Sequence, residues 1–333
     1  MTVDALFLSL TSCFRHSTTL VITPVLLSII MVLALSSFIL QPSFSETIAF
    51  GNNGTAITTC NCVVFRMDGI QDYWISAGQL AAMNQFMVRN QSLTLGIVTN
   101  ATGEDTDIVD NVRRGVESGI FELATHGTND TAHTALSEEQ QRNSLNQSNA
   151  KLITLFGRAS EVFIPPFDAF NAETINAMRQ VNMTMLSGNT SSISELQLNG
   201  SNNESSTLSP LSDPIQFRTI YYIPSTISFK EYIDDQYLRN SVEDIFNNAT
   251  QSIGAYGYAV VVMNIIDFMI PDPAGDPTET VNVNEITDLA RLIDLMLTSN
   301  IPIGSFSEVT AGMQNQGNNT LLMPISNSTS LTS

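Results

Sequence analysis

The stretch FELATHGTNDTAHTALSEEQQRNSLNQSNAKLITLFGRASEVFIPPFD, residues 121–168, decides the fold. Its first five residues are typical of a short strand, and residues 162–164 of a second one. Between them, Ser137 and Gln140 have the Ser-x-x-Gln spacing of a capping box, which predicts a helix that ends at Gly157. Strand, helix and strand in this order predict two parallel strands joined by a right-handed crossover.

The same alternation of short apolar runs and amphipathic stretches continues on both sides of this unit. Seven or eight such units in about 270 residues predict an α/β fold with a barrel or a partly closed barrel. The expected strands cover 62–67, 93–99, 121–125, 162–164, 183–186, 220–223, 258–263 and 301–305, and the expected helices cover 76–90, 107–118, 137–156, 172–180, 242–253 and 285–298.

The charge balance excludes several classes of protein. Asp and Glu number 32 against 13 Lys and Arg, which gives a net charge of −19. Without a run of basic residues, we expect no nucleic-acid partner and no electrostatic attraction to anionic lipid. Three Cys and three His are too few for a zinc-finger array or a disulfide framework.

The first 59 residues have the pattern of an exported protein. Residues 19–40 carry no charged side chain and are long enough to cross a bilayer, so they predict a transmembrane anchor. Residues 1–18 would then be a short cytoplasmic segment and 41–59 a linker. A cleaved signal peptide is the alternative interpretation of the apolar run. We expect a single-pass protein of the cell membrane with its body outside the cytoplasm.

The body, residues 60–310, is expected to be one domain. Ser- and Asn-rich residues 187–213 predict a flexible insert, and residues 311–333 a disordered tail. The chain contains twelve Asn-x-Ser/Thr sequons, a density that fits a glycosylated surface protein. Cys60 and Cys62 would point to one face of an extended strand, too far apart for a relaxed disulfide, so we expect two buried thiols.

Polar residues follow several predicted strands, where the side chains of a parallel α/β barrel converge at one mouth. They are Asp68, His126, Asp168, Asn264 and Asp267. A carboxylate near a histidine could act as a base or belong to a metal site that activates water. Each residue also has a structural interpretation: the acids and the Asn as caps, and the lone His as a structural side chain.

Four segments resemble, in order and spacing, the polysaccharide deacetylases of the NodB-homology type, carbohydrate esterase family 4. The similarity is greatest to a membrane-anchored prokaryotic subgroup, and several motif positions are degraded. The segments read VFRMDGIQDYW (64–74), ELATHGTND (122–130), VFIPPFDAFN (162–171) and GYAVVVMNIIDF (257–268). The resemblance implies a distorted (β/α)7–8 barrel that hydrolyses N-acetyl groups of a cell-surface polysaccharide. It also implies a divalent metal, most often zinc, as the cofactor.

Residue by residue, the resemblance makes Asp68 the base, and His126 and Asp130 metal ligands. Gly69 stands where the family has its metal-binding Asp. In an alternative register Asp68 is the metal ligand, and Met67 stands at the position of the base. Either way, one carboxylate of the family's pair is missing.

Other positions of the family pattern also differ. Ile164 replaces an Arg that orients the base, and Asn264 replaces the late acid His, whose proton an amide cannot supply at neutral pH. Pro166 and Phe167 correspond to the loop that contacts substrate. Two hypotheses follow: a metal-dependent deacetylase of impaired activity, and a catalytically inactive glycan-binding protein that keeps the barrel.

Overall fold

The structure is a computed structural model that describes residues 49–50, 56–57, 60–188, 220–233 and 236–314. The chain divides into two compact units, Met1–Glu46 and Thr47–Ser333, and all described residues belong to the second. The predicted anchor at 19–40 and the predicted insert lie wholly or mainly outside the described residues. Among the described residues, no helix is both long and apolar enough to span a bilayer.

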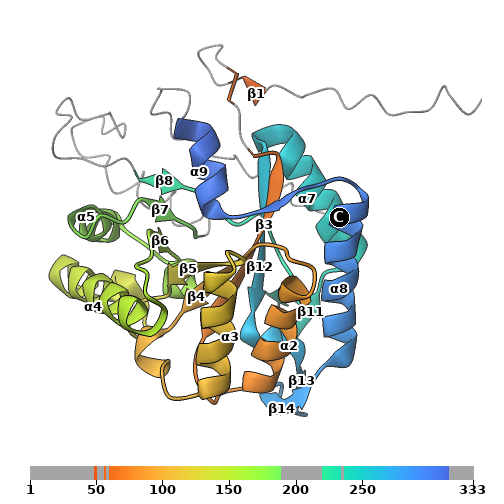
Figure 1. Cartoon of the computed structure of the whole chain (residues 1–333), viewed down its shortest axis with the longest axis horizontal. Helices are drawn as coiled ribbons and strands as arrows, with labels where there is room; N and C mark the ends of the chain where they lie inside the picture. Colours follow the sequence, from red (N-terminus) through yellow and green to blue (C-terminus); the bar gives the residue numbers. More distant parts are fainter. Residues whose placement is uncertain (1–48, 51–55, 58–59, 189–219, 234–235, 315–333) are drawn as a thin grey trace, which may run out of the picture. The chain divides into compact units, whose positions relative to one another are not determined.

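A nine-stranded parallel sheet forms the centre of this unit (Figure 1). Its strands follow the order β8-β7-β6-β5-β4-β3-β12-β9, and β15 pairs with the first half of β3. Over the described residues, β8 and β9 at the two ends do not pair with each other, so the expected barrel is only partly closed. The bounds are β3 Cys62–Ile70, β4 Leu93–Ile97, β5 Phe121–Thr125, β6 Val162–Phe163, β7 Met185–Leu186, β8 Tyr221–Tyr222, β9 Ile227–Ser228, β12 Tyr258–Asn264 and β15 Ile303–Gly304.

Helices cover the outer face of the sheet in the order α5, α4, α3, α2, α8, α7, each contacting the next. α4 has the predicted capping box between Ser137 and Gln140, and it ends at Gly157 in a left-handed conformation. The expected helices are therefore confirmed, with small shifts at their ends. The bounds are α2 Ser76–Met87, α3 Thr106–Glu117, α4 Glu138–Phe156, α5 Ala172–Gln180, α7 Val242–Tyr256 and α8 Val283–Thr298.

Short elements at the edges were not expected from the sequence. They are two antiparallel hairpins, β10 Lys230–Ile233 with β11 Gln236–Arg239 and β13 Met269–Pro271 with β14 Pro277–Val281, and the last helix, α9 Phe306–Gln314. α9 extends past the predicted domain boundary at residue 310. A further short pair joins β1 Ala49–Phe50 to β2 Ala56–Ile57. These strands are too short for a clear hydrophobic period.

Strand β3 places two charged side chains inside the curl of the sheet. Alternate residues of a strand point to opposite faces. Val63, Phe65 and Met67 pack in the core beneath the helices, whereas Cys62 and Val64 belong to the inner core cluster with α9. The next two residues on that inner face are Arg66 and Asp68, which lie at the carboxyl-terminal half of the strand. The alternation along β3 therefore places this ion pair at the carboxyl-terminal ends of the strands, which we call the mouth of the sheet.

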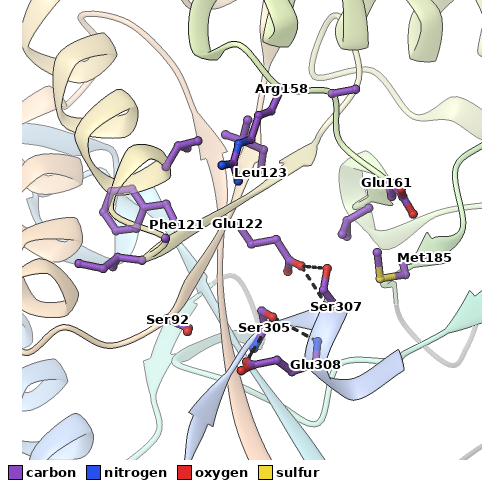
Figure 2. Close-up of a pocket in the computed structure, with 15 residues that line it drawn as sticks. Ser92, Phe121, Glu122, Leu123, Arg158, Glu161, Met185, Ser305, Ser307 and Glu308 are labelled. Atoms are coloured by element: carbon purple, nitrogen blue, oxygen red, sulfur yellow. Dashed lines mark hydrogen bonds between the residues drawn. The ribbon is translucent and has the colours of Figure 1, made fainter. Parts of the chain in front are cut away.

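At the amino-terminal ends of the strands, the first turn of α9 lines a pocket of about 440 Å³ (Figure 2). The Glu122 carboxylate, on β5, accepts hydrogen bonds from the backbone N–H groups of Phe306 and Ser307 at 2.9 and 3.0 Å. A carboxylate at a helix N-terminus satisfies free donors and the positive end of the dipole. Glu308, which also lines the pocket, accepts from the backbone N–H of Ser305. These acids therefore hold α9 in place.

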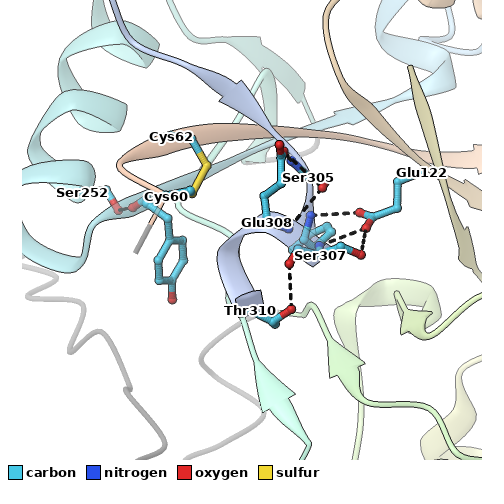
Figure 3. Close-up of a disulfide and its surroundings, with 10 residues drawn as sticks. Cys60, Cys62, Glu122, Ser252, Ser305, Ser307, Glu308 and Thr310 are labelled. Atoms are coloured by element: carbon cyan, nitrogen blue, oxygen red, sulfur yellow. Dashed lines mark hydrogen bonds between the residues drawn. A yellow bond between two sulfur atoms is a disulfide. The ribbon is translucent and has the colours of Figure 1, made fainter. Parts of the chain in front are cut away.

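The prediction of two thiols is wrong, because Cys60 and Cys62 form a disulfide (Figure 3). Asn61 between them has φ 48°, so the chain turns there and β3 begins only at Cys62. The prediction assumed an extended backbone through all three residues. The turn brings the two Cα atoms to 5.1 Å, within the usual range for a disulfide.

Candidate functional site

The side chains of Arg66 and Asp68 form a bidentate ion pair at the mouth of the sheet. Arg66 Nε lies 3.0 and 3.1 Å from the two carboxylate oxygens of Asp68, and Arg66 Nη2 lies 2.7 Å from Oδ2. Two residues on the same strand face can form this geometry without any loop movement. Both oxygens of Asp68 are therefore held by one guanidinium group.

The remaining donors of Arg66 reach two neighbouring strand ends. Nη2 donates to Asp168 Oδ1 at 2.6 Å, and Nη1 donates to Ser187 Oγ at 2.9 Å. Asp168 follows β6, and Ser187 directly follows β7. Burial opposes the charge on Arg66, but attraction by Asp68 and Asp168 outweighs it and raises the pKa of the guanidinium. One buried cation thus links the ends of β3, β6 and β7.

His126 lies directly after β5, beside this network. Its backbone N–H donates to the carbonyl of Ile97, which fixes the turn. The imidazole Nδ1 is buried without a hydrogen-bond partner, and Nε2 lies 3.7 Å from Asp130 Oδ1. Burial lowers the pKa of His126, against the attraction of Asp68 and Asp130. The structure therefore places His126 and Asp130 side by side; their role as metal ligands stays a prediction.

His133, the other histidine of the described residues, has a structural environment. Its ring contacts Phe163 edge-to-face at 4.8 Å, and its Nδ1 lies 3.2 Å from the carbonyl oxygen of Thr131. Burial lowers its pKa to about 4. Gly127 makes room for it, because a Cβ at that position would lie 2.6 Å from the His133 ring. His133 packs under the loop that carries His126.

The three positions that the resemblance marks as different from the family pattern, Ile164, Asn264 and Gly69, lie at or near the strand ends of the mouth. Ile164 is buried in the inner core cluster, and Asn264 ends β12 directly opposite Asp68. Gly69 forms a register shift at the end of β3 with φ +88°. A Cβ on Gly69 would meet Ile265 at 3.6 Å. A side chain there would be strained and would point at this apolar neighbour.

Exposed aromatic side chains are found in the loops that follow β3 and β6, both at the carboxyl-terminal ends of the strands. Tyr73, Trp74 and Phe167 are 68%, 47% and 72% exposed. Tyr73, Phe167 and Asp168 have φ between 55° and 58°, a region that non-glycine residues rarely adopt. Such strain is concentrated at functional sites. Pro166, which precedes Phe167, is buried.

The side chains at the mouth fall short of a three-ligand metal centre. Gly69 supplies no ligand, and Arg66 engages both oxygens of Asp68. Of the predicted ligands, His126 and Asp130 remain, with the Nε2 and Oδ1 atoms that could bind a metal ion. Catalytic zinc sites use three protein ligands. Across the part of the chain that the structure describes, no group of three or more His, Cys, Asp or Glu is arranged to hold a metal ion. The residues present therefore do not fit the family's cofactor.

Arg66 and Ser187 were missed as site residues in the sequence. The family pattern places its Arg before Pro165, where this chain has Ile164, and not on strand β3. The signal was nevertheless present, because Arg66 and Asp68 are two residues apart on a predicted strand and so share a face. Ser187 carries no comparable signal, since it stands at the start of a Ser- and Asn-rich segment.

Comparison with known proteins supports the resemblance. The family model described as Polysaccharide deacetylase matches residues 81–186, from α2 to β7. A putative polysaccharide deacetylase from Mycobacterium smegmatis has the same fold, with a TM-score of 0.54 and 14% identity over 84% of this chain and 100% of that one. A search of curated proteins finds no match.

Two further solved structures are similar at lower scores. One is a family 4 acetyl xylan esterase from Clostridium thermocellum with a cobalt ion, at TM-score 0.47 and 14% identity over 75% of this chain and 90% of that one. The other is a family 4 pseudoenzyme from Bacillus anthracis, at TM-score 0.47 and 12% identity over 75% and 65%. The matched region of this chain contains His126, Asp130 and Asp168 but begins after β3.

Proposed function

We propose that this polysaccharide-deacetylase-like domain binds a cell-surface glycan at the mouth of its sheet and does not hydrolyse it by a metal-dependent route. The observation that carries the proposal is the set of exposed aromatic rings, Tyr73, Trp74 and Phe167, in the two loops at that edge. Apolar ring faces left in water are costly unless a partner covers them. The C–H faces of sugar rings are a suitable partner.

The residues that replace family positions at the mouth support the loss of metal-dependent hydrolysis. Gly69 supplies no carboxylate at the position of the family's metal-binding Asp. Asn264 offers no proton at the position of the late acid. The chain's own residues thus hold and orient a ligand more readily than they transfer protons.

Metal-dependent deacetylation is the second candidate, because His126 Nε2 and Asp130 Oδ1 lie 3.7 Å apart at the motif positions. In this hypothesis Asp68 is the base, and His126 and Asp130 bind zinc. Its test is acetate release from an N-acetylated glycan by the full chain with added zinc. Release above that of a His126→Ala variant would support the enzyme and contradict our proposal.

Glycan binding has a direct test in Phe167→Ala. We expect the dissociation constant for a glucosamine-based oligosaccharide to rise about two- to tenfold, because one stacking surface is lost. Isothermal titration calorimetry of the full chain in detergent measures the change. Ile153→Ala, which removes an exposed aliphatic side chain from α4, is the matched control. Equal affinities for both variants and the unmodified chain would contradict a stacking role for the exposed rings of Tyr73, Trp74 and Phe167, which we call the rim.

We also propose that the body acts outside the cytoplasm, anchored by residues 19–40. The disulfide between Cys60 and Cys62 supports an oxidising compartment, and the twelve sequons fit an exported surface. Protease added to intact cells should digest the body. Protection of the body in intact cells, with digestion only after lysis, would contradict this location.

A further inference from the structure

The fold divides the Asn-x-Ser/Thr sequons into accessible and inaccessible ones. Six of the twelve lie wholly among the described residues: those of Asn90, Asn100, Asn129, Asn146, Asn182 and Asn248. A sequon is an acceptor for N-linked glycosylation in a surface loop, and its third residue must carry a hydroxyl group. A usable sequon in a folded protein therefore combines an exposed Asn outside the helices with a hydroxyl group that no other residue engages.

The sequons of Asn90 and Asn129 meet both conditions. Asn90 is exposed in the turn between α2 and β4, where its φ is 52°. Among the described residues, neither its side chain nor the hydroxyl of Ser92, which lines the pocket in Figure 2, has a hydrogen-bond partner. Asn129 and Thr131 are exposed in the loop after β5. Asn129 Oδ1 accepts a hydrogen bond from Asn100 Nδ2 at 3.1 Å, which leaves the amide nitrogen of Asn129 and the Thr131 hydroxyl available.

The sequons of Asn146 and Asn248 lie inside helices. Asn146 belongs to α4, and its hydroxyl residue, Ser148, is fully buried. Asn248 belongs to α7, where Asn248 Nδ2 and Thr250 Oγ1 each donate to a backbone carbonyl one turn earlier at 2.8 Å. A transferase could bind either sequon only after part of the helix has opened, and this opening costs free energy.

Two further sequons have an engaged hydroxyl group. Thr102, the third residue of the Asn100 sequon, is buried, and its Oγ1 donates to two backbone carbonyl groups. Thr184, the third residue of the Asn182 sequon, donates from Oγ1 to Glu161 Oε2 at 2.9 Å. Burial withholds the first of these sequons. The bond to Glu161 is exposed and can exchange with water, so we expect slower modification at Asn182.

We propose that Asn90 and Asn129 are N-glycosylation sites, and that the fold withholds Asn100, Asn146 and Asn248 from modification. The co-substrate is an oligosaccharide linked to a polyprenyl diphosphate. The Asn amide nitrogen attacks the anomeric carbon of this oligosaccharide and forms a C–N bond. The C–O bond to the diphosphate breaks, polyprenyl diphosphate leaves, and the amide nitrogen loses one proton. The inference rests on the proposed location of the body outside the cytoplasm, because sequons are used in exported proteins.

The test adds a transferase to the folded full chain. The chain is purified in detergent from cells without N-glycosylation, then incubated with a single-subunit oligosaccharyltransferase and a polyprenyl-diphosphate-linked oligosaccharide. Mass spectrometry of the glycopeptides measures the occupancy of each sequon. We expect the occupancy of Asn90 and Asn129 to be at least about tenfold that of Asn146 and Asn248, because opening a helix breaks hydrogen bonds.

Short peptides separate the effect of the fold from that of the local sequence. Residues 86–96 contain the Asn90 sequon, and residues 242–254 contain the Asn248 sequon. Isolated segments of this length form little helix in water, so both peptides should be modified. In the full chain, Ser92→Ala should abolish the modification of Asn90. Thr250→Ala, the matched control, removes a hydroxyl that α7 already engages and should change the occupancy of no sequon.

The outcomes distinguish glycosylation from the location on which it depends. Equal occupancy of the helical and the loop sequons in the folded chain would overturn the inference. Modified peptides with no transfer to Asn90 and Asn129 of the folded chain would also overturn it. The full chain isolated from its own cells should carry oligosaccharides on both residues. If both are unmodified there while protease digests the body on intact cells, the inference fails and the proposed location stands. If the body is also protected from protease, the proposed location itself fails.

Discussion

Replacing Arg66 with methionine should lower the free energy of unfolding by about 3–5 kcal/mol, the cost of leaving a buried charge without its partner. Methionine keeps most of the side-chain volume, so the loss comes from the charge and its hydrogen bonds. Asp68 would lose its bidentate ion pair with Arg66. Asp168 Oδ1 would lose its 2.6 Å hydrogen bond from Arg66 Nη2. Urea unfolding of the full chain, followed by circular dichroism, measures the change.

An exposed ion pair provides the control for this experiment. Arg113 pairs with Asp110 on α3, and the two side chains are 41% and 63% exposed. Arg113→Met should cost only about 0–1 kcal/mol, the range for surface pairs. Adding Asp68→Asn to Arg66→Met should recover part of the stability, because one orphaned charge disappears. Equal losses for Arg66→Met and Arg113→Met would show that the buried network does not hold the mouth together.

The same network joins the strand ends at the mouth through hydrogen bonds of the protein itself. In a three-ligand site the cation itself draws the strand ends together. Here the guanidinium of Arg66 joins β3, β6 and β7 and neutralises part of the carboxylate charge. The loop that carries Phe167 is attached to this network through Asp168. Arg66 therefore supports the shape of the rim from a fully buried position.

The central fold could be predicted because its signals are local. The β5–α4–β6 unit has alternating elements of ordinary length, a capping box at Ser137 and a terminating Gly157. The two hairpins lack such signals, since their strands have three to five residues. They depend on distant contacts: β10 and β11 form ion pairs with α8, and β14 packs against α2. Closure of the sheet depends on pairing across its ends, which no local pattern encodes.

The site was predictable only where a residue stands at a strand end. Asp68, His126 and Asp130 could be placed there from the order of the elements. The orientation of Asp68 depends on Arg66, a partner that spacing on one strand allows but does not require. The disulfide depends on the left-handed conformation of Asn61, which the sequence alone does not reveal. Side-chain partners and single backbone turns thus needed the structure.

Asp267 should make the stability of the protein depend on pH between about 4 and 7. It follows β12 and is 2% exposed, and its Oδ2 accepts the backbone N–H of Asn264 at 2.8 Å. Burial raises its pKa to about 7 from 3.8, helped by the charges of Glu285 and Asp68, although the Asn264 N–H and Lys230 act in the opposite direction. The folded state therefore holds this proton where the unfolded chain has released it.

The sign of the effect follows from the raised pKa. Asp267 contributes most to stability below pH 3.8, and the contribution is lost as pH rises through about 7. Asp267→Asn keeps an acceptor for the Asn264 N–H but cannot ionise. The difference in free energy of unfolding between the variant and the unmodified chain should increase by about 2–3 kcal/mol, in favour of the variant, from pH 5 to pH 8.

Urea unfolding of both proteins at the two pH values measures this difference. His133 titrates in the opposite sense, because its lowered pKa of about 4 makes stability rise with pH up to its ordinary value near 6.5. That contribution is common to both proteins and cancels in the comparison. Asp294→Asn, at an exposed acid whose pKa is lowered by its hydrogen bond to Arg89, should show no gain toward pH 8. A pH-independent difference between Asp267→Asn and the unmodified chain would mean that Asp267 is already ionised in the folded protein at pH 5.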